Sequence, residues 1–145
     1  MSESIRARFR NLADKVMLPN RNIKNVDVTG DGKIDGFQFD IVNPFYTAEP
    51  VSSVKDLLLK IDGEKANPEE ICLVVRDQRI RIRDAPTIYE TWWGFGEVIK
   101  VFVGKPGGLR KGRHELDCTL YMRTSAGDYG FGDIELPKKV TMEVK

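Results

Sequence analysis

The chain has 145 residues, 41% of them hydrophobic and 31% charged, and its 23 basic side chains nearly balance its 22 acidic ones. That length suits one domain, and the composition excludes a disordered tail. A formal net charge of +1 supplies no overall field to hold nucleic acid or an acidic membrane, so neither is expected as a partner.

The sequence shows no signal for export or membrane insertion. No apolar run approaches the ~20 residues of a membrane span, and arginines interrupt the apolar residues near the start, unlike a secretory signal. Cys72 and Cys118 are the two cysteines, too few for a disulfide framework in a domain of this size. We therefore expect a cytoplasmic protein with reduced thiols.

Residues 1–21 are predicted to form an arm or a short helix ahead of a single β domain over residues 22–145. The helical alternative depends on apolar residues at steps of four, three and four, which would form one stripe of a helix. These are Ile5, Phe9, Leu12 and Val16. No good helix cap precedes them, so an irregular arm stays open.

From Asn25 onward apolar residues alternate with polar ones, which is the pattern of half-buried β-strands. A hairpin is predicted around Gly30-Asp31-Gly32, because glycines supply the positive φ that a tight turn requires. Strands at this regular spacing predict an all-β fold, an antiparallel β-sandwich of about eight strands. The clearest strand covers 114–122, and others cover 57–61, 71–75 (buried on both faces), 80–82, 98–103 and 140–144 (at a sheet edge).

Residues 27–38 imitate a calcium-binding loop, with the carboxylates of Asp27, Asp31 and Asp35 at regular spacing around a turn glycine. Two features oppose calcium. Gln38 stands where a bidentate glutamate normally closes such a loop, and the flanking residues favour strands over helices. A hairpin turn decorated with aspartates is therefore preferred, calcium is the weaker alternative, and no metal or cofactor is assigned to this chain.

His114 is the only histidine, and it shares the apolar face of its predicted strand, so a partly buried structural role is favoured over a metal ligand. The basic, glycine-rich residues 105–113 lack the Gly-Lys-Ser/Thr of a phosphate loop and are interpreted as a solvated connection. No Ser-His-Asp or Cys-His set can be assigned. The chain is therefore predicted to carry no catalytic residues.

Aromatic residues are more informative. Trp92 and Trp93 are adjacent, so on a strand they point to opposite faces and only one can join the core. The other is expected at the surface, as part of a protein interface or a sugar-stacking platform, unless it packs in a small second core under a loop. The candidate interface or pocket-rim residues are Phe45, Tyr46, Trp92, Trp93 and Phe95.

Three segments carry a resemblance to a known family. Within residues 22–125, the strings DGKIDGFQFDIVNPFYTAEPVSSVKDLLLKIDGE, YETWWGFGE and GGLRKGRHELDCTLYMRTS are similar to the small β subunit of bacterial C-glycoside deglycosidases. The most specific points are Gly36-Phe37-x-Phe39, Pro44-Phe45-Tyr46, Asp62-Gly63-Glu64, Gly107-Gly108-Leu109 and Gly112-x-His114.

The resemblance implies a division of labour between two subunits. This chain would bind a larger (β/α)₈-barrel α subunit, in a hetero-oligomer of paired αβ units, and would be inactive alone. The barrel would carry the acid/base residues and a divalent metal, Mn²⁺. The assembled enzyme would be a carbon–carbon lyase that splits 3-keto C-glucosides of flavonoids and related phenols by elimination, unlike hydrolases whose paired carboxylates attack an acetal.

A free-standing carbohydrate-binding module is the alternative function, with the tryptophans as a platform and calcium at residues 27–35. A β-sandwich suits both functions, so the fold cannot discriminate between them. A secreted module normally carries a signal peptide or a linker, which favours the subunit. A small independent sugar-converting enzyme is a third possibility, weakened by the single histidine.

Overall fold

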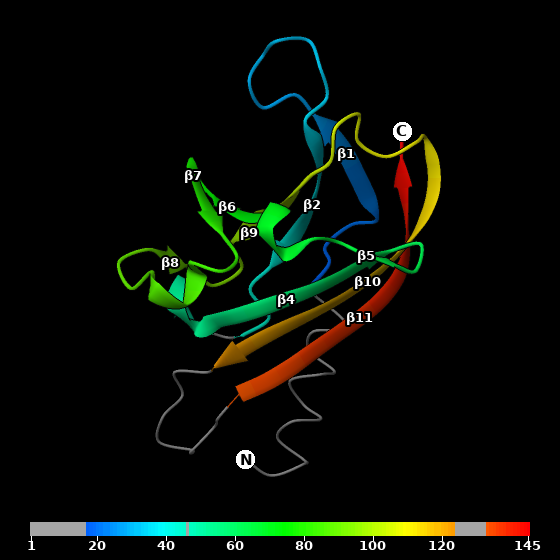
Figure 1. The fold of residues 1–145 in the computed structure, drawn as a ribbon. Helices are drawn as coiled ribbons and strands as arrows, with labels where there is room; N and C mark the ends of the chain where they lie inside the picture. The colour runs from blue at the N-terminus through cyan, green and yellow to red at the C-terminus, as the bar shows by residue number, and fades with distance from the viewer. Residues whose placement is uncertain (1–16, 46, 124–132) are drawn as a thin grey trace.

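The structure is a computed structural model that describes residues 17–45, 47–123 and 133–145 (Figure 1). Within these ranges, three short 3₁₀ helices connect the strands: η1 (Val51–Ser53), η2 (Pro68–Glu70) and η3 (Ala85–Thr87). The strands of the described part are β1 (Asn22–Val26), β2 (Gly36–Val42), β3 (Glu49–Pro50), β4 (Val54–Ile61), β5 (Glu64–Lys65), β6 (Ile71–Val75), β7 (Gln78–Arg81), β8 (Trp92–Trp93), β9 (Val98–Gly104), β10 (Gly112–Arg123) and β11 (Asp133–Val144). The all-β prediction is confirmed.

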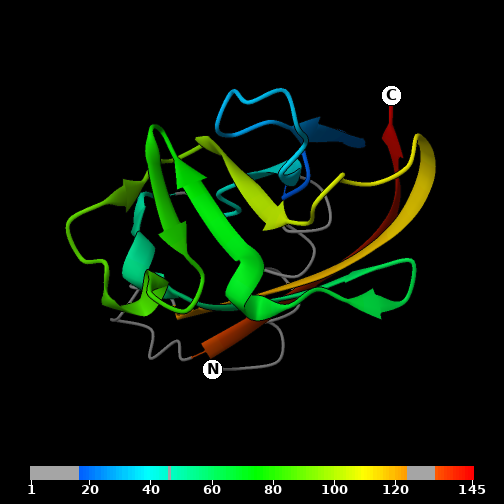
Figure 2. The same ribbon diagram turned by 45° about the horizontal axis from the view of Figure 1, so that its top comes forward.

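Hydrogen bonds join nine of the described strands into one sheet, in the order β5-β4-β10-β11-β1-β2-β9-β6-β7, while β3 and β8 form a separate pair. Neighbouring strands are antiparallel except β1 and β11, which run parallel. The sheet curls, so that the wing of β4, β10 and β11 faces the wing of β2, β9, β6 and β7 (Figures 1 and 2). A sandwich of two separate sheets is not confirmed, because β1 links the two wings.

The hydrophobic core fills the space between the wings. Along β10 every second side chain from His114 to Met122 is buried, as its alternating sequence predicts. Those from Leu116 to Met122 belong to the same buried cluster as Leu73 of β6 and Val101 of β9. Removing such apolar surface from water, at ~25 cal/mol per Å², is what holds the two wings together.

Two strand predictions are wrong in detail. β6 is buried on its inner face only, since Cys72 and Val74 on its other face are partly exposed. Residues 140–144 do not form a short edge strand. They end the twelve-residue β11, which lies between β10 and β1 in the middle of the sheet.

The predicted hairpin around residues 30–32 exists, since β1 and β2 pair in antiparallel fashion from Lys24 to Val26. β1 ends at Val26, so Val28, which continues the alternation of apolar residues, lies exposed in the loop over residues 27–35. The predicted N-terminal arm or helix lies outside the described residues up to position 16. From there on, Met17 and Leu18 are buried in the core. Across the described ranges, no helix is long and apolar enough to cross a lipid bilayer.

Candidate functional site

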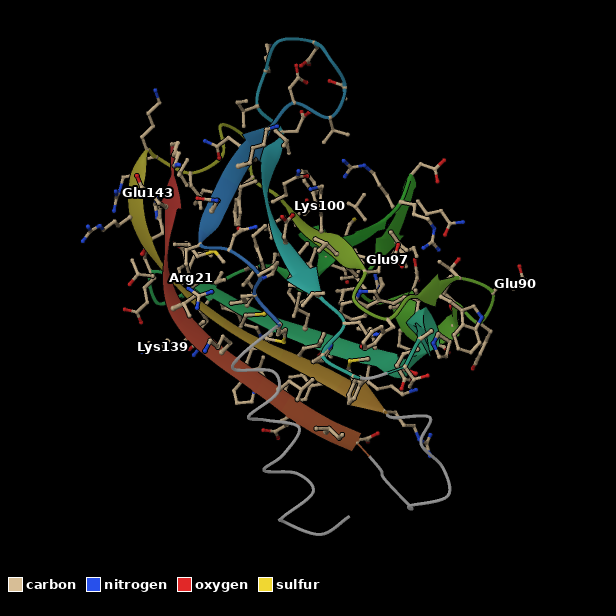
Figure 3. The ribbon with its side chains drawn as sticks, turned by 180° about the vertical axis from the view of Figure 1, so that it is seen from behind. Arg21, Glu90, Glu97, Lys100, Lys139 and Glu143 are labelled. Carbon is tan, nitrogen blue, oxygen red and sulfur yellow. The ribbon has the colours of Figure 1, made fainter. Side chains whose placement is uncertain are left out.

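Exposed apolar side chains concentrate in one stretch of the chain, residues 89–98. Among the described residues, five large hydrophobic side chains are exposed, and four of them belong to this stretch. We call these four the apolar surface: Tyr89 (71% exposed), Trp92 (50%), Phe95 (65%) and Val98 (48%). Figure 3 shows Glu90 and Glu97, from the same stretch, on the side of the molecule away from Lys139 and Glu143. Exposed aromatic side chains such as Tyr89, Trp92 and Phe95 are candidates for a binding surface.

The two tryptophans point to opposite faces of β8, as predicted. Trp93 is 1% exposed and belongs to the hydrophobic core, where its Nε1 donates to the carbonyl oxygen of Glu97 at 2.8 Å. Trp92 points outward because strand geometry alternates its side chains. The buried tryptophan therefore fixes the strand that carries the exposed one.

Phe95 stands at the tip of a tight turn over residues 94–97. The N–H of Glu97 donates to the carbonyl of Gly94 at 3.0 Å, and Gly96 has φ +70°. Phe95 is not among the residues with positive φ, so the turn is of type II, in which the third position favours glycine. The turn thus lifts the phenyl ring away from the core.

The Glu97 carboxylate braces this turn. Its Oε1 accepts the N–H of Gly94 at 2.8 Å, and its Oε2 forms an ion pair with Nη1 of Arg76 at 2.7 Å. Arg76 also donates from Nη2 to the carbonyl of Trp92 at 3.1 Å. One carboxylate therefore holds both ends of the turn that displays Phe95 and, through Arg76, the backbone beside Trp92.

Asn43 ties the base of the turn to the segment that follows β2. This buried side chain donates from Nδ2 to the carbonyls of Trp93 at 3.1 Å and Thr47 at 3.0 Å. Its Oδ1 accepts the N–H of Phe45 at 2.8 Å, and the Phe45 ring packs in the core. The Asn43 amide therefore joins the segment of Phe45 to the segment of Trp93, both of which contain candidate interface residues.

The five candidate interface residues fall into three groups. Trp92 and Phe95 present their side chains at the surface, and their role at an interface stays a prediction. Phe45 and Trp93 pack inside the chain, so neither offers a surface of its own. Tyr46 lies outside the described residues.

Sequence analysis missed Tyr89 and Val98. Tyr89 lies in an irregular connection between η3 and β8, where no periodicity is available to assign a face. Val98 could have been found, because it shares the outer face of β9 with Lys100 and Phe102. A hollow of about 520 Å³ lies next to Tyr89, between residues 87–91 and strand β7.

His114 is buried and bonded at both ring nitrogens, as a structural histidine would be. Its Nδ1 lies 2.7 Å from Oδ2 of Asp62, and its Nε2 lies 2.8 Å from the carbonyl oxygen of Arg110. Both partners accept hydrogen bonds, so both nitrogens donate only when the ring is an imidazolium. The N–H of Glu115, which donates to Asp62, and the bond from His114 hold the pKa of the Asp62 carboxyl below its usual range.

The basic residues 105–113 are held as a connection between strands. Asn25 donates to the carbonyl of Leu109 at 2.8 Å and accepts its N–H at 2.9 Å, in the manner of a paired strand. Gly108 has φ +68°, and a Cβ there would overlap the Asn25 side chain. The contacts with Asn25 therefore explain the presence of Gly108 and the position of Leu109. A hollow of about 310 Å³ lies beside Leu109 and Lys105.

The aspartates of the β1–β2 loop come together. One ligand atom from each of Asp27, Asp31 and Asp35 lies within 4.8 Å of the others. Their oxygens accept N–H groups of the same loop: Asp27 accepts from Gly32 at 2.7 Å, which lowers the pKa of its carboxyl. These bonds explain the arrangement as a decorated turn, and calcium binding stays an untested alternative.

Comparison with known proteins finds a matching family and a related protein. A family model described as C-glycoside deglycosidase beta subunit matches residues 13–126, which include the apolar surface, Asn43 and His114. The chain is also similar to the C-glycoside deglycosidase beta subunit of Eubacterium cellulosolvens, with 31% identity over 96 residues. That match covers 66% of this chain and 63% of the relative's length. The chain belongs to the C-glycoside deglycosidase β-subunit family.

Proposed function

We propose that this chain is the small accessory subunit of a C-glycoside deglycosidase. The observation that carries the proposal is the apolar surface, four exposed side chains in one stretch that lies within the family match. A partner that covers these side chains would remove them from water at a gain of ~25 cal/mol per Å². The partner we propose is a larger (β/α)₈-barrel α subunit, in a hetero-oligomer.

The proposed substrate is a 3-keto C-glucoside of a flavonoid or related phenol. The ketone at sugar carbon 3 makes the proton on carbon 2 acidic, so a base can remove it. The bond from carbon 1 to the aryl carbon then breaks, the aryl carbon takes up a proton, and a carbon–carbon double bond forms between carbons 1 and 2. The acid/base groups and a Mn²⁺ ion that stabilises negative charge would belong to the α subunit.

This chain would contribute binding surface, not catalytic groups. Its one histidine is already engaged at both ring nitrogens, by Asp62 and by the carbonyl of Arg110. The Cys118 thiol is fully buried, and burial raises its pKa to about 12, which keeps it protonated and unreactive. Trp92 and Phe95 would contact the α subunit or form part of the rim of its pocket.

Reconstitution tests the proposal. The purified chain and the α subunit would be assayed separately and together for release of the free phenol from a 3-keto C-glucoside, with size-exclusion chromatography to detect a complex. Activity in the mixture only is the expected result. A barrel that is fully active alone and forms no complex would overturn the accessory function and bring the carbohydrate-binding module forward.

A further inference from the structure

Both the backbone and the carboxylate of Glu97 make polar contacts around one turn. Its N–H and carbonyl oxygen bind Gly94 and the Trp93 indole, and its two carboxylate oxygens bind the Gly94 N–H and Arg76. The side chain of Phe95, at the tip of this turn, is 65% exposed. The contacts of Glu97 therefore hold the glycine-rich residues 94–97 in one conformation, with the Phe95 side chain exposed to solvent.

The charges that touch this turn neutralise each other. Arg76 and Glu97 form an ion pair at 2.7 Å, and the second guanidinium nitrogen of Arg76 is directed to the Trp92 carbonyl. Neither group needs a charge from outside. A partner surface that fits around Phe95 and Trp92 is therefore expected to be apolar and to carry no charge opposite this pair.

We propose that the turn over residues 94–97 is a pre-formed anchor that seats Phe95 in an apolar and uncharged recess of the α subunit. Glu97 is its positioning residue: it acts through Phe95 and does not itself contact the partner. The inference rests on the proposed function and adds the contact and its chemistry. A rigid aromatic anchor binds well because little conformational freedom remains to be lost on docking.

The test measures the dissociation constant of the complex with the α subunit, by titration calorimetry or biolayer interferometry. Phe95→Ala should weaken binding by about tenfold or more, as expected for a central aromatic anchor. Glu97→Ala should also weaken binding, and Glu97→Gln should recover part of the loss because its amide oxygen can still accept the Gly94 N–H. Added to Phe95→Ala, Glu97→Ala should have no further effect.

Two control variants change comparable groups elsewhere. Val28→Ala trims an exposed apolar side chain in the β1–β2 loop, and Glu69→Gln breaks the exposed ion pair with Arg83. Both should bind like the unmodified chain. Phe95→Gln, a polar side chain of similar reach, replaces Phe95→Ala if melting curves show that the alanine variant is unfolded.

Three results would overturn the inference. Unchanged affinity in both Phe95 variants would remove the anchor. Independent, additive losses for Phe95→Ala and Glu97→Ala would remove the positioning role. A steep fall of affinity with added salt would contradict an uncharged recess. If the unmodified chain neither binds nor activates the α subunit, the proposed accessory function is wrong. If it activates the α subunit and the Phe95 variants bind equally well, only the anchor is wrong.

Discussion

The two adjacent tryptophans should differ sharply in what they contribute to folding. Replacing Trp93 by alanine removes a side chain that is 1% exposed. A buried tryptophan removes ~150–250 Å² from water, worth about 4–6 kcal/mol at ~25 cal/mol per Å². Loss of the bond from Nε1 to the Glu97 carbonyl adds about 1 kcal/mol. Alanine keeps part of the burial and neighbouring groups relax in part, so we expect Trp93→Ala to cost about 3–5 kcal/mol.

Trp92→Ala should cost about 2 kcal/mol or less, because half of that side chain is already in water and no cavity forms. Urea unfolding followed by far-ultraviolet circular dichroism measures both, since the signal does not depend on indole fluorescence. Trp93→Phe serves as the matched control and should lose about 1–2 kcal/mol. Equal destabilisation by the two alanine variants would refute the assignment of one tryptophan to the core and one to the surface.

Three further predictions concern the described residues around the core. Because folding lowers the pKa of the Asp62 carboxyl, its ionised form stabilises the folded chain above about pH 4. This stabilisation is lost as the pH falls through the pKa that Asp62 has in the folded chain. Asp62→Asn should flatten the acid side of the Tm–pH curve, and an unchanged slope would contradict this origin. Gly108→Ala should cost about 2–3 kcal/mol in urea unfolding, since strain and overlap combine, while Gly107→Ala, with φ +82° and open space, should cost about 1 kcal/mol. A thiol reagent at about pH 8 should leave Cys118 unlabelled in the native chain, because burial raises the pKa of its thiol to about 12, and should label both cysteines in urea. Rapid labelling of Cys118 in the native chain would argue against its burial.

The alternation of apolar residues was a reliable guide wherever one strand face meets water. Residues 114–122 show it without interruption, and each apolar member proved buried. The tryptophan pair could be assigned to opposite faces for the same reason. Local sequence thus contains the information about which side of a strand faces inward.

What local sequence lacks is the identity of the neighbouring strand. Residues 140–144 look like a terminal edge, yet β11 lies at the centre, because its neighbours β1 and β10 are chosen by pairing over long sequence separations. Pro137 interrupts the pattern of β11 and hid its full length. The exposed Tyr89 was missed because irregular backbone has no period from which a face can be inferred.

The parallel pairing of Asn22 with Glu143 has a consequence for biosynthesis. The ribosome makes β1 early, but the strand that joins it to β10 is made after all the other described strands. Until residues 133–144 emerge, the long edge of β10 and the edge of β1 stay unpaired, and such edges readily pair with other chains. Closure must then span most of the sequence, which slows folding. The nascent chain therefore passes through a stage in which these two strand edges are exposed to misassembly, and chaperone demand should be greatest just before β11 is complete.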